Sequence, residues 1–134
     1  MAESTTQVAE EEKAPANVTR IYSGIQPTGE IHIGNYLGAI RNWVRLIPQY
    51  DCIYCVVDYH AITIEYDPAG MSAAIVDTAM TGMACGLDPE KCTLFVQSHV
   101  PETTELAWVF NAVISMGALN RMTQFKDKAS QHQR

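Results

Sequence analysis

Three short apolar runs, each followed by a segment of helical periodicity, organise the chain. The runs lie around Thr19–Ser23, at Cys52–Val57 and at Thr93–Gln97, and their length and apolar character predict strands. Cys52–Val57 is apolar at successive positions, which is typical of a parallel strand covered on both faces. Because strand and helix alternate three times at short spacing, the pattern predicts an α/β fold with a Rossmann-like, doubly wound parallel sheet.

The first helix is predicted from His32–Gly34 to about Ile47, where Pro48 follows and ends it. Its apolar side chains recur three and four residues apart, as expected for one buried face. They are Leu37, Ile40, Val44 and Ile47.

The second and third helices also have recognisable ends. The second is predicted to open at Asp67-Pro68, an N-cap followed by proline at the first helical position, and to stop at Gly86. The third is predicted to start at Pro101 and to fade near Gly117. Trp43 and Trp108 fall within predicted helices, where packing is the expected role.

Charge is spread unevenly along the chain. Residues 1–17 hold four glutamates against Lys13, a net of −3, and few large apolar side chains. Such a segment cannot offset its ordering entropy, so we expect a disordered acidic tail at 1–17 and an ordered domain at 18–134. The whole chain carries a net charge of −6, which disfavours autonomous nucleic-acid binding. We expect a cytoplasmic protein with no membrane association, since neither a secretory signal nor a long apolar span is present.

Cys52 and Cys55 form a CxxC pair inside the second predicted strand. Residues three apart on a strand point to opposite faces, so the two thiols diverge. No second CxxC accompanies them, and we expect buried reduced cysteines and no metal site.

Polar residues concentrate after each predicted strand. The segments are Ser23–Asn35, Asp58–Thr63 and Gln97–Glu102. Because the carboxyl ends of parallel strands meet at one sheet edge, the topology predicts a ligand site there.

Ser23–Asn35 is the most informative of these segments. It is a glycine-rich turn that leads into a helix, where backbone N–H groups can receive phosphate oxygens. His32 and Asn35 lie three apart on one face and both offer donors, and Gly34 leaves room for a close approach to the backbone. The segment matches neither GxGxxG nor a P-loop. From the residues alone, nucleotide binding and a tight turn capped by His32 both stay open.

The same segment carries a family resemblance. PTGEIHIGNYLGA, with HIGN at His32–Asn35, resembles the HIGH signature of class I aminoacyl-tRNA synthetases. SGIQPTG, VDYHAIT and RMTQFKDK resemble the tryptophan-specific branch. Asn35 replaces the last histidine of the signature, as is usual in that branch, and tyrosine is the nearest competing substrate.

The resemblance implies roles for individual residues at the ATP end of the site. His32 would donate toward the α-phosphate, and Asn35 would share this catalytic role at the phosphate end. The implied ATP-binding residues are Gln26, Pro27, Thr28, Gly34, Asn35 and Lys128.

At the amino-acid end, Tyr22 and Gly24 would flank the substrate and His60 would approach its polar end. Gln124 would contact the substrate from a mobile segment that also holds Lys128. His60 and His99 each have a simpler reading, as strand-end histidines satisfied by backbone groups.

The function implied is tryptophan–tRNA ligase. With ATP and Mg²⁺, such an enzyme activates tryptophan to tryptophanyl-adenylate and then charges tRNA(Trp), usually as a homodimer.

The third helix, with Trp108, Phe110 and Met116, would supply either an interface or a core-facing stripe. No KMSKS-like segment occurs before Arg134, and no acidic residue is a convincing partner for the indole N–H, so we expect an incomplete catalytic domain that is not competent alone. A non-catalytic truncated paralogue, acting in dimerisation or regulation, and another adenylate-forming nucleotidyltransferase are the alternatives.

Overall fold

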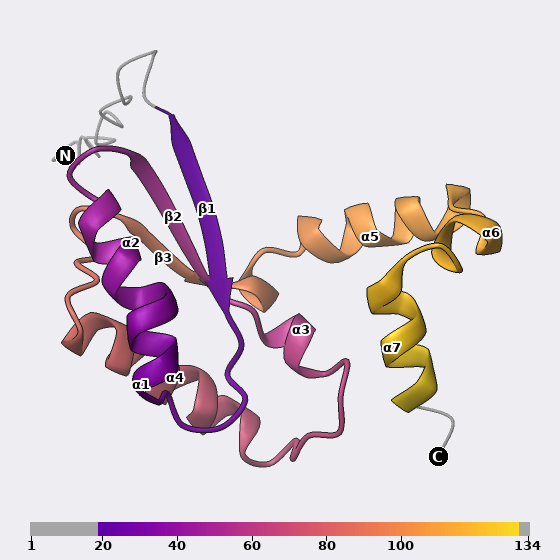
Figure 1. Cartoon of the computed structure of the whole chain (residues 1–134), viewed down its shortest axis with the longest axis horizontal. Coiled ribbons are helices and arrows are strands. Elements are labelled where there is room, and N and C mark those ends of the chain that lie inside the picture. Colours follow the sequence, from indigo (N-terminus) through magenta and orange to yellow (C-terminus); the bar gives the residue numbers. More distant parts are fainter. Residues whose placement is uncertain (1–18, 132–134) are drawn as a thin grey trace, which may run out of the picture.

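A parallel three-stranded sheet forms the centre of the molecule, and the computed structural model describes residues 19–131 (Figure 1). The strands are β1 (Arg20–Ile25), β2 (Asp51–Val56) and β3 (Thr93–Val96), in the order β1-β2-β3. Both neighbouring pairs are parallel. The predicted α/β fold with a parallel sheet is therefore confirmed. The predicted tail at 1–17 lies outside the described residues.

Helices connect the strands and continue beyond the last one. Between β1 and β2 lie α1 (Ile33–Asn35), the π-helix η1 (Tyr36–Ile40) and α2 (Arg41–Leu46). Between β2 and β3 lie α3 (Asp58–Ala61) and α4 (Met71–Ala84). After β3 come η2 (Gln97–His99), α5 (Glu102–Val113), α6 (Met116–Leu119) and α7 (Thr123–Gln131).

The core lies on one face of the sheet. Tyr54 is fully buried there, stacks on the Trp43 ring with centroids 4.7 Å apart, and donates from its hydroxyl to the Trp43 carbonyl at 2.9 Å. Ile40, the last residue of η1, and Leu87, just after α4, join the same cluster. Both crossovers thus pack against one face, as right-handed connections must when the strand order follows the sequence. Trp43 has the packing role that its helical position predicts.

The two cysteines of the CxxC pair lie on opposite faces of β2. Cys52 belongs to the core cluster with Tyr54 and Cys92, whereas the Cys55 thiol meets the Tyr22 hydroxyl on the other face. These three cysteines are free thiols, and burial raises the pKa of the Cys55 and Cys92 thiols. A raised thiol pKa disfavours the reactive thiolate.

The first helix spans its predicted range but contains a π-helical turn, which periodicity could not indicate. Asn42 compensates there, donating from its side-chain amide to the Gly38 carbonyl at 3.3 Å. Such turns are found frequently at functional sites, and this one directly follows His32–Asn35.

The predicted start of the second helix is wrong. Asp67 does not cap it, because its carboxylate accepts a hydrogen bond from the Ala69 amide at 3.0 Å and closes a turn instead. The helix begins at Met71, after the N-cap Gly70. Its predicted stop is confirmed at Gly86, whose φ of +111° is a glycine conformation.

The third helix ends at Val113, before the predicted fade at Gly117. Ile114 is extended, with ψ of 134°, and Ser115 caps a new helix by accepting from the Ala118 amide at 3.2 Å. Gly117 therefore lies inside α6.

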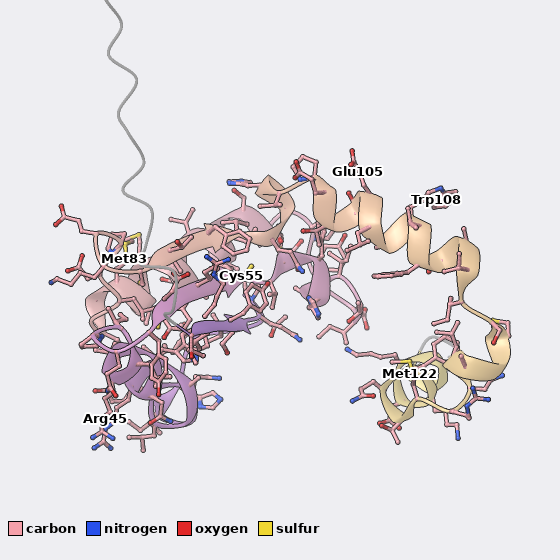
Figure 2. All side chains as sticks on the ribbon, turned by 90° about the horizontal axis from the view of Figure 1, so that it is seen from above. Arg45, Cys55, Met83, Glu105, Trp108 and Met122 are labelled. Atoms are coloured by element: carbon pink, nitrogen blue, oxygen red, sulfur yellow. The ribbon has the colours of Figure 1, made fainter. Side chains whose placement is uncertain are left out.

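Helices α5, α6 and α7 form an arm (residues 102–131) that extends away from the sheet (Figures 1 and 2). No residue of α5 is buried, and Trp108 is 75% exposed. The packing role and the core-facing stripe expected of this helix are wrong for the described part of the chain. Within residues 19–131, no helix is both long and apolar enough to cross a bilayer.

Candidate functional site

The turn after β1 ends in a corner built by three hydrogen-bonded residues. His32 is the N-cap of α1, and its Nδ1 accepts from the Gly34 amide at 3.1 Å. The His32 amide in turn donates to Asn35 Oδ1 at 3.1 Å, which completes a capping box. These two bonds hold both side chains in fixed positions at the start of the helix.

The capping bonds determine which atoms remain for a ligand. Since Nδ1 of His32 accepts, the proton of the neutral ring is on Nε2, which is left as a donor. Asn35 uses its oxygen in the cap, so its Nδ2 amide is the group that remains to donate. The corner thus offers two donors toward an anion while both acceptors are already occupied.

Gly34 has a structural role in addition to the one predicted. A Cβ on Gly34 would lie 2.8 Å from Cε1 and 2.9 Å from Nδ1 of the His32 ring. The glycine therefore makes room for the capping histidine, and a ligand's approach to this backbone stays a prediction.

A cavity of about 440 Å³ opens beside this corner. It brings together five predicted site residues, namely Gly24, Gln26, Thr28, His32 and Asn35, with Ile25, Gly29, Glu30, Ile31 and Ala39 also in its wall. Gly24 leaves room for the Val57 side chain, because a Cβ there would lie 2.7 Å from Val57 Cγ1. The cavity is thus formed at the carboxyl end of β1, where the topology predicted it.

Pro27 is buried and is not among the residues that line this cavity. With Thr28 and Gly29 it lines a neighbouring hollow of about 290 Å³, across from Ile64–Asp67. Pro27 therefore supports the loop that carries Gln26 and Thr28.

Tyr22 lies on the sheet face opposite the core. It sits two residues before Gly24 on the same face of β1 and is 59% exposed. Partial burial and the hydrogen bond with the Cys55 thiol raise the pKa of Tyr22, so its hydroxyl stays protonated. An exposed ring at this place is available to flank a substrate.

His60 lies on α3 and opens to a third cavity, of about 730 Å³, between α3 and α5. Its Nδ1 is 3.1 Å from Gln97 Oε1. The ring is held by a side chain rather than by a backbone group. His99, on η2, lies outside the residues that line the three cavities.

Two buried polar residues beside His60, Asp58 and Gln97, begin polar segments that the sequence placed at the sheet edge, but neither was predicted as a site residue. Asp58 accepts at Oδ1 from the Tyr59 amide at 3.1 Å and from the Ser98 amide at 3.0 Å, which ties the end of β2 to the end of β3. Gln97 is buried at the end of β3 and reaches His60. Their position as the first polar residue after an apolar strand is the signal that could have singled out each residue within its segment.

Gln124 and Lys128 lie on α7, the last helix of the arm, and Figure 1 shows this helix separated from the sheet. In Figure 2, Cys55 marks the sheet while Trp108 and Met122 mark the arm. The structure therefore does not bring these two residues to the corner at His32, and their predicted ligand contacts stay predictions.

Comparison with known proteins places this geometry in context. Residues 14–134 match the family model described as tRNA synthetases class I (W and Y). A solved tryptophanyl-tRNA synthetase from Campylobacter jejuni is 34% identical with a TM-score of 0.77, covering 85% of this chain and 36% of that one. The structure of that synthetase with ADP and tryptophan also has 34% identity and a TM-score of 0.77, covering 84% and 35%.

Two further structures extend the comparison. Tryptophanyl-tRNA synthetase from Mycoplasma pneumoniae is 36% identical with a TM-score of 0.76, covering 84% of this chain and 34% of that one. A tyrosyl-tRNA synthetase from Archaeoglobus fulgidus, solved with L-tyrosine, is 19% identical with a TM-score of 0.66, covering 78% and 34%, which supports the fold alone. The chain spans about a third of the length of these solved relatives.

Proposed function

The chain belongs to the class I tRNA synthetases of the tryptophan and tyrosine group, and we propose that it supplies the nucleotide- and amino-acid-binding part of a tryptophan–tRNA ligase. The observation that carries this proposal is the corner at His32–Asn35, which places two side chains, each with a donor not used in the cap, in the wall of a cavity of about 440 Å³. The reaction would couple tryptophan, ATP and tRNA(Trp).

In the first step, an oxygen of the tryptophan carboxylate attacks the α-phosphorus of ATP. A new O–P bond forms, the bond to the β-phosphate oxygen breaks, and pyrophosphate leaves. In the second step, a terminal ribose hydroxyl of tRNA(Trp) takes the acyl group and AMP departs. The substrate carboxylate is the nucleophile, so the protein acts by positioning and by stabilising charge.

Within this reaction, His32 Nε2–H and the Asn35 amide would donate to the phosphates. Both groups are fixed before a ligand binds, and preorganised donors cost little reorganisation when charge develops. The Mg²⁺ ion would be held mainly by the nucleotide, since residues 19–131 gather no cluster of three or more metal-binding side chains. Gln26 and Thr28 would contact ATP from the loop.

Tryptophan is favoured over tyrosine by two lines of support. The tryptophanyl relatives are 34% and 36% identical, whereas the tyrosyl structure is 19% identical. One of the tryptophanyl relatives was solved with ADP and tryptophan. Gly24 lies near the carboxyl end of β1, with Tyr22 two residues before it, and His60 lies on α3, just after β2. The amino acid would bind there, next to ATP.

The proposed enzyme is a cytoplasmic homodimer, which would contact tRNA mainly through regions other than this chain. The dimer is supported by the apolar surface of α5, where Leu106, Trp108 and Phe110 are more than half exposed. Apolar patches of this kind mark interaction surfaces. The same observation favours a second candidate function, a non-catalytic module that only dimerises, which would bind no nucleotide.

Calorimetric titration of the chain tests the proposal. We expect binding of ATP and of tryptophan, weaker binding of tyrosine, and a loss of ATP affinity in His32→Ala. The matched control is His99→Ala, which changes a histidine outside the cavity walls and should leave ATP affinity unchanged. Tighter binding of tyrosine would contradict the substrate, and absence of nucleotide binding by a folded dimer would favour the dimerisation module.

A further inference from the structure

The ends of β2 and β3 are joined by two side-chain links that the proposed reaction does not itself require. Asp58, buried, receives the amides of Tyr59 and Ser98 and so fixes the start of α3 against η2. Gln97, also buried, reaches from η2 to the His60 ring at 3.1 Å. The first link fixes backbone and the second fixes a side chain.

The second link leaves one ring nitrogen of His60 for a ligand. An amide oxygen only accepts, so the His60 ring makes this hydrogen bond in the tautomer that carries its proton on Nδ1. The neutral ring then has its lone pair on Nε2. His60 is exposed and lines the cavity between α3 and α5, so this nitrogen is open to a bound molecule.

The burial of the two residues separates their roles. Gln97 is 7% exposed and forms only a small part of the wall of this cavity, whereas the His60 ring beside it is exposed there. A partner of this kind sets the tautomer and orientation of a histidine, as second partners do for histidines in metal and catalytic sites.

We propose that Gln97 is a positioning residue, which keeps the proton of His60 on Nδ1 and presents the Nε2 lone pair to the α-ammonium group of the amino acid. Of the two polar groups of an amino acid, the ammonium donates and the carboxylate accepts, so a lone pair selects the ammonium. The carboxylate then stays available to attack ATP. The ammonium assignment rests on the proposed function, whereas the tautomer does not.

Long-range ¹H–¹⁵N correlation spectra of histidine rings test the tautomer in the free chain, at a pH where the rings are neutral. The His60 signal is assigned by its loss in His60→Gln. We expect the Nδ1–H form in the wild-type chain and in Gln97→Glu, which keeps an acceptor oxygen. In Gln97→Met, which has no such oxygen, the Nε2–H form should appear. An Nε2–H form in the wild-type chain, or a Gln97→Met spectrum like that of the wild type, would overturn the proposal.

Ligand titrations test the ammonium assignment separately, with tryptamine and indole-3-propionate as probes that each retain one polar group. We expect Gln97→Met to weaken tryptamine binding about fivefold to tenfold, as for the loss of one hydrogen bond, and to leave indole-3-propionate unchanged. Gln49→Met, the same substitution at an exposed glutamine on the connection after α2, serves as control. A selective loss of indole-3-propionate would overturn the assignment, whereas failure of tryptophan itself to bind would count against the proposed function and leave the tautomer result standing.

Discussion

The sheet with its packed helices and the arm that follows it differ in how they place large apolar side chains. The first region buries them, and the arm leaves them exposed. Trp43 is 6% exposed, stacked on Tyr54, while Trp108 is 75% exposed on a helix without a buried residue. Both tryptophans lie in helices that the local sequence predicts. Helical sequence alone therefore does not create a core, because burial depends on a partner surface that only the first region has.

The largest test of this comparison is truncation of each tryptophan. Trp43→Ala should lower the free energy of unfolding by about 3–5 kcal/mol, since it removes a large buried ring and leaves a cavity. Trp108→Ala should change it by less than about 0.5 kcal/mol, as for an exposed position. Urea denaturation at a low protein concentration, where any dimer dissociates, measures both. Equal losses would show that the arm packs in solution.

The amide donor of Asn35 can be tested separately from its capping oxygen. Asn35→Ala removes both the cap and the amide donor, so it should reduce ATP affinity about tenfold and lower stability by about 1 kcal/mol. Asn35→Asp keeps the accepting oxygen and should recover much of the stability while ATP affinity stays low. Calorimetric titration together with thermal unfolding gives both values. Recovery of ATP affinity by the aspartate would make Asn35 a structural cap only.

The buried hydroxyl of Tyr54 provides a smaller test within the packed region. Tyr54→Phe keeps the stack but leaves the Trp43 carbonyl without its 2.9 Å donor, which should cost about 1–2 kcal/mol of unfolding free energy. Tyr22→Phe, at an exposed position of the neighbouring strand, is the matched control and should cost less. A larger effect at Tyr22 would reverse the assigned order of burial.

Alkaline pH should destabilise the packed region gradually. Burial raises the pKa of Cys55, Cys92 and Tyr54, and each group is uncharged when protonated. The folded chain therefore holds protons that the unfolded chain releases, so stability is full below the ordinary thiol pKa of 9.0 and falls as the pH rises above it. Urea midpoints across this range measure the slope. Cys92→Ala should make it shallower, and an unchanged slope would contradict the cause given.

The sequence was sufficient for the sheet and for the main cavity because both depend on local rules. Apolar runs identified β1, β2 and β3, and the order of elements placed Gln26, Thr28 and His32 at one edge. Boundaries failed where a side chain bonded unexpectedly, as Asp67 does with Ala69.

Other features could not be predicted, because they depend on tertiary contacts or on a choice of backbone hydrogen bonds that the apolar pattern does not show. The link between His60 and Gln97 joins residues 37 apart. Exposure of Trp108 reflects the absence of a packed partner within the described residues, which no local pattern encodes. The π-helical turn at Tyr36–Ile40 reflects a hydrogen-bond choice that leaves apolar periodicity unchanged.

Backbone amide shifts of the ¹⁵N-labelled chain during titration with ATP test the central claim most directly. If the corner at His32–Asn35 receives the phosphates, the amides of Gly24–Asn35 shift first and most, while those of α5 stay in place. Shifts concentrated on α5, with Gly24–Asn35 unmoved, would contradict the assignment of the nucleotide site.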